Sequence, residues 1–295
     1  MNRRDFFRVV ALSAFAAQFG KVDRLFADST VPLDPNIVAI FSDIHLRNPE
    51  TIQAVVRFNQ CVAQVLAMNP RPAQLLIYGD LAYNAGTVED YTLFKKLIKP
   101  IEDTGIAWQA AMGNHDRLNT FREVFPERVA AAEPLENRYV NIVETPKADF
   151  ILLDSYLEGQ VRGEITQEQR DWLEEAVKRY DEKPFFVGCH HPLNETGLAE
   201  VLKAQPKFAA FLHGHNHFYR SPVQEAVQTL CFPSTGLWGD LGFVIANLTD
   251  EEATFAPRID AYQWPKWSKE KDPVEDVDAW IARLNANSPV IKLPR

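Results

Sequence analysis

The sequence predicts an α/β fold on three observations. Short apolar runs typical of buried strands alternate with segments whose apolar residues recur at helical spacing. The first half follows the order strand, helix, strand, helix, strand, which implies a largely parallel sheet. The second half holds more strands than helices, which indicates antiparallel pairing and a second sheet. No internal repeat or low-complexity linker divides the 295 residues, so we expect one domain.

Each element of the first half follows from its residue pattern. The nearly continuous apolar run Asn36–Phe41, bounded by Pro35 and Ser42, is typical of a buried strand. Apolar residues at helical spacing predict a helix over Thr51–Met68, which ends before Pro70. The other elements expected here are the strands Gln74–Tyr78 and Ile106–Met112 and a helix, Tyr91–Ile101, interrupted near Pro100.

The second half predicts further strands and a C-terminal extension. The strands are expected at Tyr139–Val143, Phe150–Leu153, Pro184–Cys189, Phe208–Leu212, Thr229–Phe232 and Phe243–Leu248. Helices are expected at Gln167–Tyr180 and Leu198–Lys203. The main domain then covers residues 36–250. Residues 251–295 are expected to pack on it as an extension, with one helix near Val274–Leu284.

The N-terminus resembles an export signal of the twin-arginine type. The adjacent Arg3 and Arg4 precede the apolar run Val9–Phe19, and cleavage near Ala27 would remove residues 1–27. The alternative is an amphipathic helix that stays on the protein. The run is about a dozen residues, shorter than the ~20 that span a bilayer, so no stable membrane insertion is expected. The signal predicts an exported, periplasmic protein that meets the export machinery transiently.

The charge balance argues against a nucleic-acid partner. The chain carries 31 basic and 40 acidic residues, a formal charge of −9. Residues 1–27 hold five basic and two acidic residues, so their removal takes the charge to −12. Nucleic-acid backbones are bound by stripes of Lys and Arg, which this composition does not favour. The three cysteines are too few for a disulfide scaffold, although one disulfide stays open.

All seven histidines lie in segments that follow predicted strands. These five polar segments are Ser42-Asp43-Ile44-His45, Gly79-Asp80, Gly113-Asn114-His115-Asp116, Cys189-His190-His191-Pro192 and His213-Gly214-His215-Asn216-His217. A lone His or Asp at a strand end is usually a hydrogen-bonding or capping residue. Several such segments in order favour one shared site, because ligands of open α/β sheets bind at the carboxyl ends of the strands.

The residue types indicate two metal ions. Two carboxylates, three or more imidazoles and an Asn carbonyl suit two divalent cations with mixed nitrogen and oxygen ligands. Two-metal sites share a ligand, and a carboxylate can bridge. A single metal would leave several of these groups without a role.

These motifs resemble those of the calcineurin-like metallophosphoesterase superfamily. Its order is Asp-x-His, Gly-Asp, Gly-Asn-His-(Glu/Asp), His, Gly-His-x-His, and the likeness covers residues 36–250. It implies a four-layer αββα sandwich with two mixed β-sheets. It also implies divalent or mixed-valent Mn, Fe or Zn at two positions. One metal would take Asp43, His45, Asp80 and His217, and the other Asp80, Asn114, His190 and His215. His190 is preferred to His191 because it stands two residues before Pro192.

The resemblance implies hydrolysis of a small phosphomonoester or phosphodiester. A hydroxide shared by the metals would attack phosphorus, His115 would protonate the leaving oxygen, and Asp116 would orient the His115 ring. The first alternative is a nuclease of the same fold, which the acidic charge disfavours. The second is a metal-bound, non-catalytic interaction module, which the presence of both the ligands and His115 disfavours.

Other residues leave alternatives open. Tyr83 completes a Gly-Asp-x-x-Tyr pattern that resembles the one in purple acid phosphatases, where the Tyr binds ferric iron. That family, however, lacks the equivalent of His45. Tyr83 is therefore expected either to form a wall of the pocket or to bind iron. The segment from Asp154 to Leu173 resembles the bacterial cyclic-nucleotide phosphodiesterase and acid phosphatase branches. Trp238 could stack on a base or sugar of the substrate, or be buried. His191 and His213 are expected to support the ligands, or to touch substrate. Specificity is expected in loops such as Leu118–Glu136.

Overall fold

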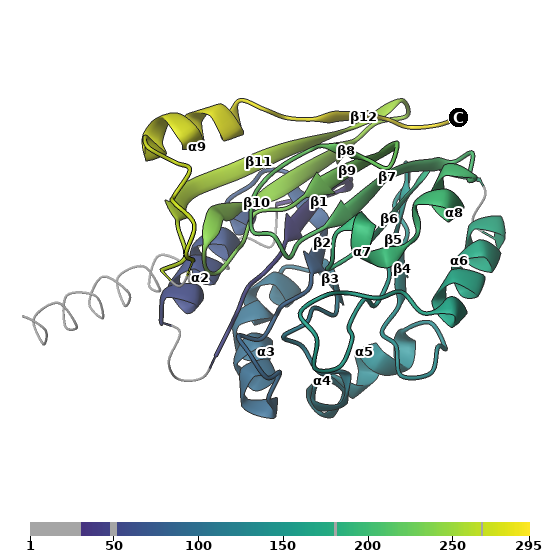
Figure 1. Cartoon of the computed structure of the whole chain (residues 1–295), viewed down its shortest axis with the longest axis horizontal. Coiled ribbons are helices and arrows are strands. Elements are labelled where there is room, and N and C mark those ends of the chain that lie inside the picture. Colours follow the sequence, from purple (N-terminus) through teal and green to yellow (C-terminus); the bar gives the residue numbers. More distant parts are fainter. Residues whose placement is uncertain (1–30, 48–51, 180–181, 267) are drawn as a thin grey trace, which may run out of the picture.

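Two six-stranded sheets form the centre of the molecule (Figure 1). The structure is a computed structural model that describes residues 31–47, 52–179, 182–266 and 268–295. In spatial order, the first sheet consists of β12 (Val290–Lys292), β11 (Glu252–Gln263), β10 (Gly239–Leu248), β1 (Leu33–Phe41), β2 (Arg71–Tyr78) and β3 (Ala107–Ala111). The second consists of β4 (Asn141–Val143), β5 (Asp149–Leu152), β6 (Phe185–Cys189), β7 (Phe208–His213), β9 (Val227–Cys231) and β8 (Val223–Gln224).

Both sheets are mixed, as predicted. Strands β1, β2 and β3 pair in parallel, which confirms the order expected for the first half. Strands β10, β11 and β12 extend this sheet antiparallel from the other side of β1. In the second sheet β5, β6, β7 and β9 are parallel, and β4 and β8 are antiparallel at the two edges.

Helices cover the outer faces of the sheets. Helices α2 (Ile52–Leu66) and α3 (Val88–Asp103) pack on the first sheet, and α6 (Gln167–Arg179), α7 (Leu193–Thr196) and α8 (Ala199–Lys203) pack on the second. The remaining helices are α4 (Leu118–Val124), α5 (Pro126–Ala131) and α9 (Val277–Asn285).

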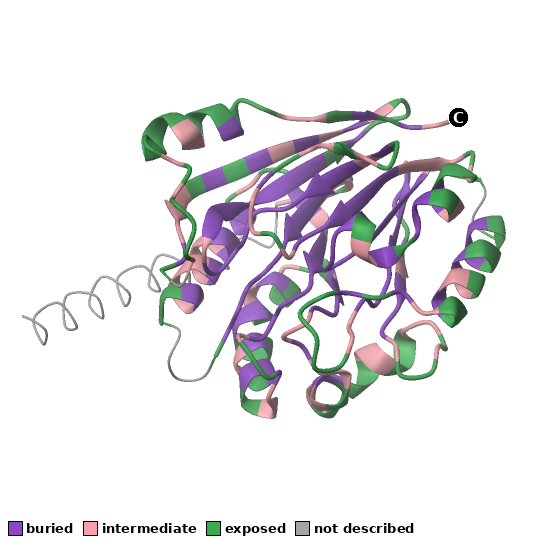
Figure 2. Ribbon diagram, viewed as in Figure 1, coloured by how far each residue is buried: buried purple, intermediate pink, exposed green. Residues whose placement is uncertain are grey.

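Three apolar clusters lie between the four layers. On β1, Ala39 and Phe41 face the helices, whereas Val38 and Ile40 face the second sheet. A third cluster joins the second sheet to α6 and α8. Because both faces of β1 are covered, its sequence is a continuous apolar run rather than an alternating one. Figure 2 shows the inner strands buried along most of their length. The predicted αββα sandwich is confirmed.

Several expected elements differ from the structure. Helix α3 continues through Pro100 to Asp103, because Leu97, Ile98 and Ile101 stay buried against the core on both sides of the proline. The expected loop Leu118–Glu136 contains the helices α4 and α5.

The C-terminal segment contributes more to the sheet than its sequence suggested. Strand β11 pairs with β10 from Leu248↔Ala253 to Gly239↔Gln263, and β12 adds an edge strand. The expected C-terminal helix is present as α9.

The predicted export signal, residues 1–27, lies outside the described residues. Within the described ranges, the helices are too short or too polar to span a membrane.

Candidate metal centre

The five polar segments meet at one edge of the sandwich. They follow the carboxyl ends of β1, β2, β3, β6 and β7, so both sheets contribute. Backbone hydrogen bonds hold neighbouring segments together: Asp43 N donates to Gly79 O (3.1 Å), and His45 N donates to Asp80 O (2.9 Å). Across the sheets, His215 N donates to Asp43 Oδ2 (3.1 Å). The loops therefore form one connected platform for the side chains.

The first group of side chains surrounds His217. Its Nε2 lies 3.1 Å from His45 Nε2 and 3.1 Å from Asp43 Oδ1. Asp80 Oδ2 is 3.9 Å from His45 Nε2. The structure thus brings together the four residues predicted for one metal.

The second group surrounds His190. Its Nε2 lies 3.2 Å from Asp80 Oδ2, 3.2 Å from Asn114 Oδ1 and 3.2 Å from His215 Nδ1. These are the four residues predicted for the other metal. Asp80 Oδ2 faces both groups, which is the position a shared ligand needs.

The donor atoms of the two groups fit bound cations. His217 Nδ1 is 2.8 Å from Leu237 O, and His190 Nδ1 is 2.8 Å from Tyr78 O. A carbonyl can only accept, so each Nδ1 carries a proton and donates it there, and each Nε2 faces the neighbouring carboxylates, where it can bind a proton or a cation. Asp43 Oδ1 is buried, and the group that faces it most closely is His217 Nε2 at 3.1 Å. Buried carboxylates that face ring nitrogens need positive charge between them, which bound cations or the imidazole protons supply.

The electrostatics also favour positive charge here. Burial would raise the pKa of Asp43 and of Asp80, but His217 lowers the first and His190 lowers the second, both to well below the usual range. Burial disfavours a charge on His190, yet Asp80 and Asp43 raise its pKa to about 10. Burial lowers the pKa of His45 to about 3. The two carboxylates are therefore ionised and attract cations.

Backbone strain is concentrated in the centre. Nine non-glycine residues of the described ranges have a left-handed backbone. Five of them are candidate ligands: Asp43, His45, Asp80, His215 and His217. Each such conformation costs about 1–3 kcal/mol and persists only where surrounding contacts enforce it. This concentration marks the edge as a functional site.

Gly113 lets the third strand approach Asp80 closely. A Cβ atom on Gly113 would lie 2.1 Å from Asp80 Oδ1, far inside contact distance. That oxygen accepts a hydrogen bond from His115 N at 2.9 Å. The glycine of the Gly-Asn-His motif therefore has a steric role in seating the shared carboxylate.

His115 lies at the mouth of the centre. Its side chain is 30% exposed, and its Nε2 is 3.9 Å from Asp80 Oδ2. Asp116 does not bond the His115 ring, which differs from our expectation. Its carboxylate accepts instead from the backbone N–H groups of Gly113, Leu81 and Ala82 and from the Tyr91 hydroxyl. Burial, and then the charge of Asp80, raises the pKa of Asp116 to about 7. Asp116 thus fixes the turn that carries His115.

His191 and His213 have structural partners. His191 Nδ1 is 2.8 Å from Ser155 Oγ, and its Nε2 is 3.0 Å from Val161 O, so both ring nitrogens are engaged by the protein. Burial lowers its pKa and keeps the ring neutral. His213 Nδ1 bonds Gly214 O at 2.9 Å. Neither ring lines the cavity over the centre.

A cavity of about 290 Å³ opens over the two groups. Its lining residues are His45, Asp80, Asn114, His115, Val161, His215, Asn216, His217, Phe218, Trp238, Gly239 and Pro265. None of these lining residues is Lys or Arg. Tyr83 is not among them; its ring lies 6.3 Å from that of His45 and 6.0 Å from that of Trp238. The cavity lining therefore does not support the pocket wall that we expected of Tyr83, and iron binding stays the alternative. No motif marks Val161, Phe218 or Pro265, because they reach the cavity through tertiary packing.

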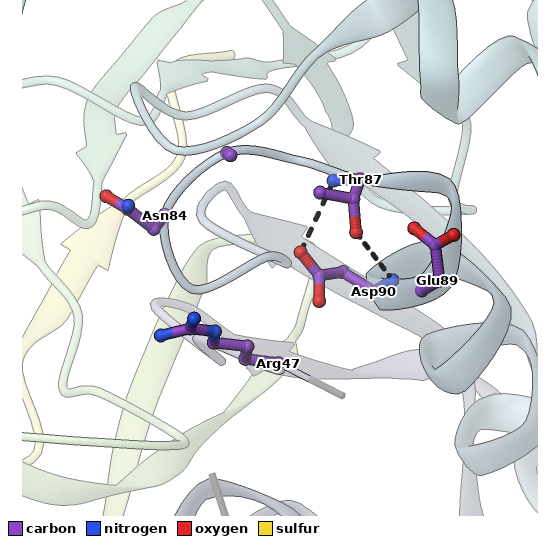
Figure 3. A pocket seen from close by; sticks show the side chains of 6 residues that line it. Arg47, Asn84, Thr87, Glu89 and Asp90 are labelled. Carbon is purple, nitrogen blue, oxygen red and sulfur yellow. Dashed lines mark hydrogen bonds between the residues drawn. The ribbon is translucent and has the colours of Figure 1, made fainter. Parts of the chain in front are cut away.

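A second cavity, of about 310 Å³, does not suit an anion (Figure 3). It lies between Arg47 and the start of α3. There Thr87 Oγ1 accepts from Asp90 N, and Asp90 Oδ2 accepts from Thr87 N. The acidic Glu89 and Asp90 already complement the positive end of the helix dipole. Phosphate would meet two carboxylates there.

Comparisons with known proteins identify similar phosphodiesterases. No family model matches the chain. It is 27% identical over 237 residues to a "probable cyclic nucleotide phosphodiesterase" of Rhodococcus erythropolis, covering 73% of this chain and 76% of the relative. It is 24% identical over 257 residues to a "probable glycerophosphodiester phosphodiesterase GpdQ" of Arcobacter nitrofigilis, covering 80% and 90%.

Solved structures show the same fold. A dimetal phosphatase from Danio rerio superposes with a TM-score of 0.62 at 12% identity, covering 77% of this chain and 97% of the other. The structure of PhoD superposes with a TM-score of 0.52 at 11% identity, covering 78% and 67%. The chain has the metallophosphoesterase fold. Its relatives support the calcineurin-like metallophosphoesterase superfamily and a phosphoester hydrolase.

Proposed function

We propose that the chain is a binuclear-metal-dependent phosphohydrolase whose substrate is a small phosphodiester. The observation that carries the proposal is the position of Asp80 Oδ2 between the His45 and His190 groups. The names of the relatives support a diester. So does the absence of Lys and Arg from the described cavity lining, because a monoester dianion needs more positive charge than a diester monoanion. A phosphomonoester is the alternative substrate.

The two groups of side chains support the proposed metal ligands. Asp43, His45, Asp80 and His217 would hold one cation, and Asp80, Asn114, His190 and His215 the other. Manganese, iron and zinc all accept such nitrogen and oxygen ligands. When bound, two cations would neutralise charge on the phosphoryl oxygens and lower the pKa of a water nucleophile.

The chain's own residues handle the leaving group. His115 borders the cavity, and its partly exposed ring can give a proton to the leaving oxygen. Its backbone is tied to Asp80, and the turn before it is tied to Asp116. Proton donor and shared ligand are thereby held at a fixed separation.

The test combines metal analysis with two substrates. Purified protein is loaded with manganese, and bound metal is counted by mass spectrometry. Hydrolysis of bis(p-nitrophenyl) phosphate is compared with that of p-nitrophenyl phosphate. We expect two metals per chain and the higher kcat/KM on the diester. Two metals without activity on either compound would favour a non-catalytic interaction module. Cleavage of single-stranded DNA in preference to both would favour a nuclease.

We also propose that the protein is exported to the periplasm. The proposal rests on Arg3 and Arg4 before the apolar run Val9–Phe19. Cell fractionation of the wild type and of a double variant, Arg3→Lys with Arg4→Lys, tests it. We expect the wild type in the periplasm and the variant retained in the cytoplasm. Equal distribution of the two would contradict the proposal.

A further inference from the structure

Trp238 shares the strained backbone of the metal centre. Its φ is +61°, in the left-handed region that a bulky residue rarely adopts. Of the nine non-glycine residues described with such a backbone, five are candidate ligands. Trp238 is the one further member that lines the cavity. Strain of this kind collects at functional sites, which suggests that the position of this indole matters to the function.

The loop around Trp238 is locked onto the metal centre. The Trp238 ring stacks on His217 with centroids 6.0 Å apart and planes at 20°. His217 Nδ1 bonds Leu237 O, and Asp240 N donates to His217 O at 2.8 Å. A Cβ on Gly239 would lie 2.1 Å from His217 O, so only glycine fits beside the tryptophan. The ring is therefore presented in one orientation.

The C-terminal segment completes an apolar wall beside Trp238. Trp238 N donates to Gln263 Oε1 at the end of β11 (3.4 Å), and Pro265 of the same segment lines the cavity. Phe218 packs on Trp264 with centroids 6.1 Å apart. Trp238 and Phe218 are only half-buried, so each presents part of its ring to the cavity. The polar groups of the centre suit the phosphoryl group, and this wall suits an apolar, planar group.

We propose that Trp238, supported by Phe218 and Pro265, determines specificity by stacking on a planar aromatic group of the substrate, such as a nucleobase. The inference deepens the proposed function and rests on it. Stacking of a base on an aromatic side chain contributes about tenfold or more in affinity. A glycerol group would gain no comparable contact from this wall, because it has no planar face to stack on the rings.

The kinetic test uses two diesters with the same leaving group. These are thymidine 5′-(p-nitrophenyl phosphate) and methyl p-nitrophenyl phosphate. We expect the wild type to prefer the nucleoside ester at least about tenfold in kcat/KM. In Trp238→Leu this preference should fall about tenfold, mainly through KM, and Trp238→Phe should restore most of it. Trp172→Leu, at another half-buried tryptophan, is the matched control and should keep the preference. A preference unchanged in Trp238→Leu would overturn the inference.

A binding measurement separates this inference from the proposed function. Calorimetry on manganese-loaded protein compares adenosine 5′-monophosphate with ribose 5-phosphate. We expect the nucleotide to bind at least about tenfold tighter to the wild type and to Trp172→Leu, but not to Trp238→Leu. This result without any hydrolysis would reject the proposed function and keep the stacking role. Hydrolysis of the diesters combined with equal binding of adenosine 5′-monophosphate and ribose 5-phosphate would keep the proposed function and reject the stacking role. If Trp238→Leu does not fold, Phe218→Leu replaces it, with the same expected loss and the same contradicting result.

Discussion

The backbone N–H of His115 donates to Asp80 Oδ1 at 2.9 Å, while Asp80 Oδ2 faces the ring nitrogens of His45 and His190. One oxygen of Asp80 thus positions His115, the proposed proton donor, and the other faces the proposed metal positions. Any change that moves Asp80 should disturb both parts of the centre at once.

Asp80→Asn should reduce bound metal to fewer than two ions per chain. The amide lacks the negative charge that both groups share, so turnover should fall at least about 10³-fold. Metal analysis and diester hydrolysis measure the two effects. Asp149→Asn is the control. Asp149 lies in the second sheet, is as buried as Asp80 and accepts a hydrogen bond from Lys183, so this variant should keep both metals. Full metal content in Asp80→Asn would rule out the shared-ligand assignment.

His115→Asn should keep both metals and lose turnover selectively. Loss of a general acid costs about 10²–10⁴-fold when the leaving group is a poor one, and much less with p-nitrophenolate, which needs little protonation. Alkyl and nitrophenyl diesters are compared at constant metal content. A parallel loss of metal would show that His115 is a ligand and not the proton donor.

Gly113→Ala should displace Asp80 and weaken metal binding. The new Cβ would lie 2.1 Å from Asp80 Oδ1, so the strand or the carboxylate must move, at a cost of about 1–3 kcal/mol in the free energy of unfolding. Thermal unfolding and metal titration measure both effects. Gly159→Ala is the control for metal binding: its Cβ would meet nothing within 4 Å, so it should bind metal like the wild type, although the φ of +70° at this position costs some stability.

Asp154 should make stability depend on pH, with a sign opposite to that of an ordinary salt-bridged carboxylate. Burial raises its pKa to about 6, whereas the unfolded chain has the ordinary value of 3.8. The folded state therefore prefers the neutral acid. Asp154 therefore contributes fully to the free energy of unfolding below about pH 4. This contribution, about 3 kcal/mol, is lost as the pH rises through 6.

Urea unfolding of metal-free wild type and Asp154→Asn between pH 4 and pH 7 checks this sign. The wild type should lose stability relative to the variant as the pH rises. Asp250→Asn changes a side chain that is 82% exposed, so its unfolding free energy should depend on pH in the same way as that of the wild type. Parallel curves for all three proteins would contradict the prediction.

The meeting of the candidate ligands at one edge could be predicted because each follows a strand whose pattern is local. Continuous apolar runs mark β1 and β2 as buried on both faces, and parallel strands end at a common edge. Strand β11 was missed because Pro257 and its alternating polar residues resemble an irregular tail, and its pairing with β10 is tertiary. The partners of Asp116 were missed for a similar reason: Tyr91 lies 25 residues away along the chain.

The central position of β1 has a consequence for how the protein is made. One neighbour of β1 is β2, but the other is β10, which is synthesised about 200 residues later. Until β10 leaves the ribosome, β1 has an open edge, and the loop that presents His217 lacks its support from Asp240. Such high contact order slows folding. The candidate metal ligands are thus held in their final positions only after β10 has been translated.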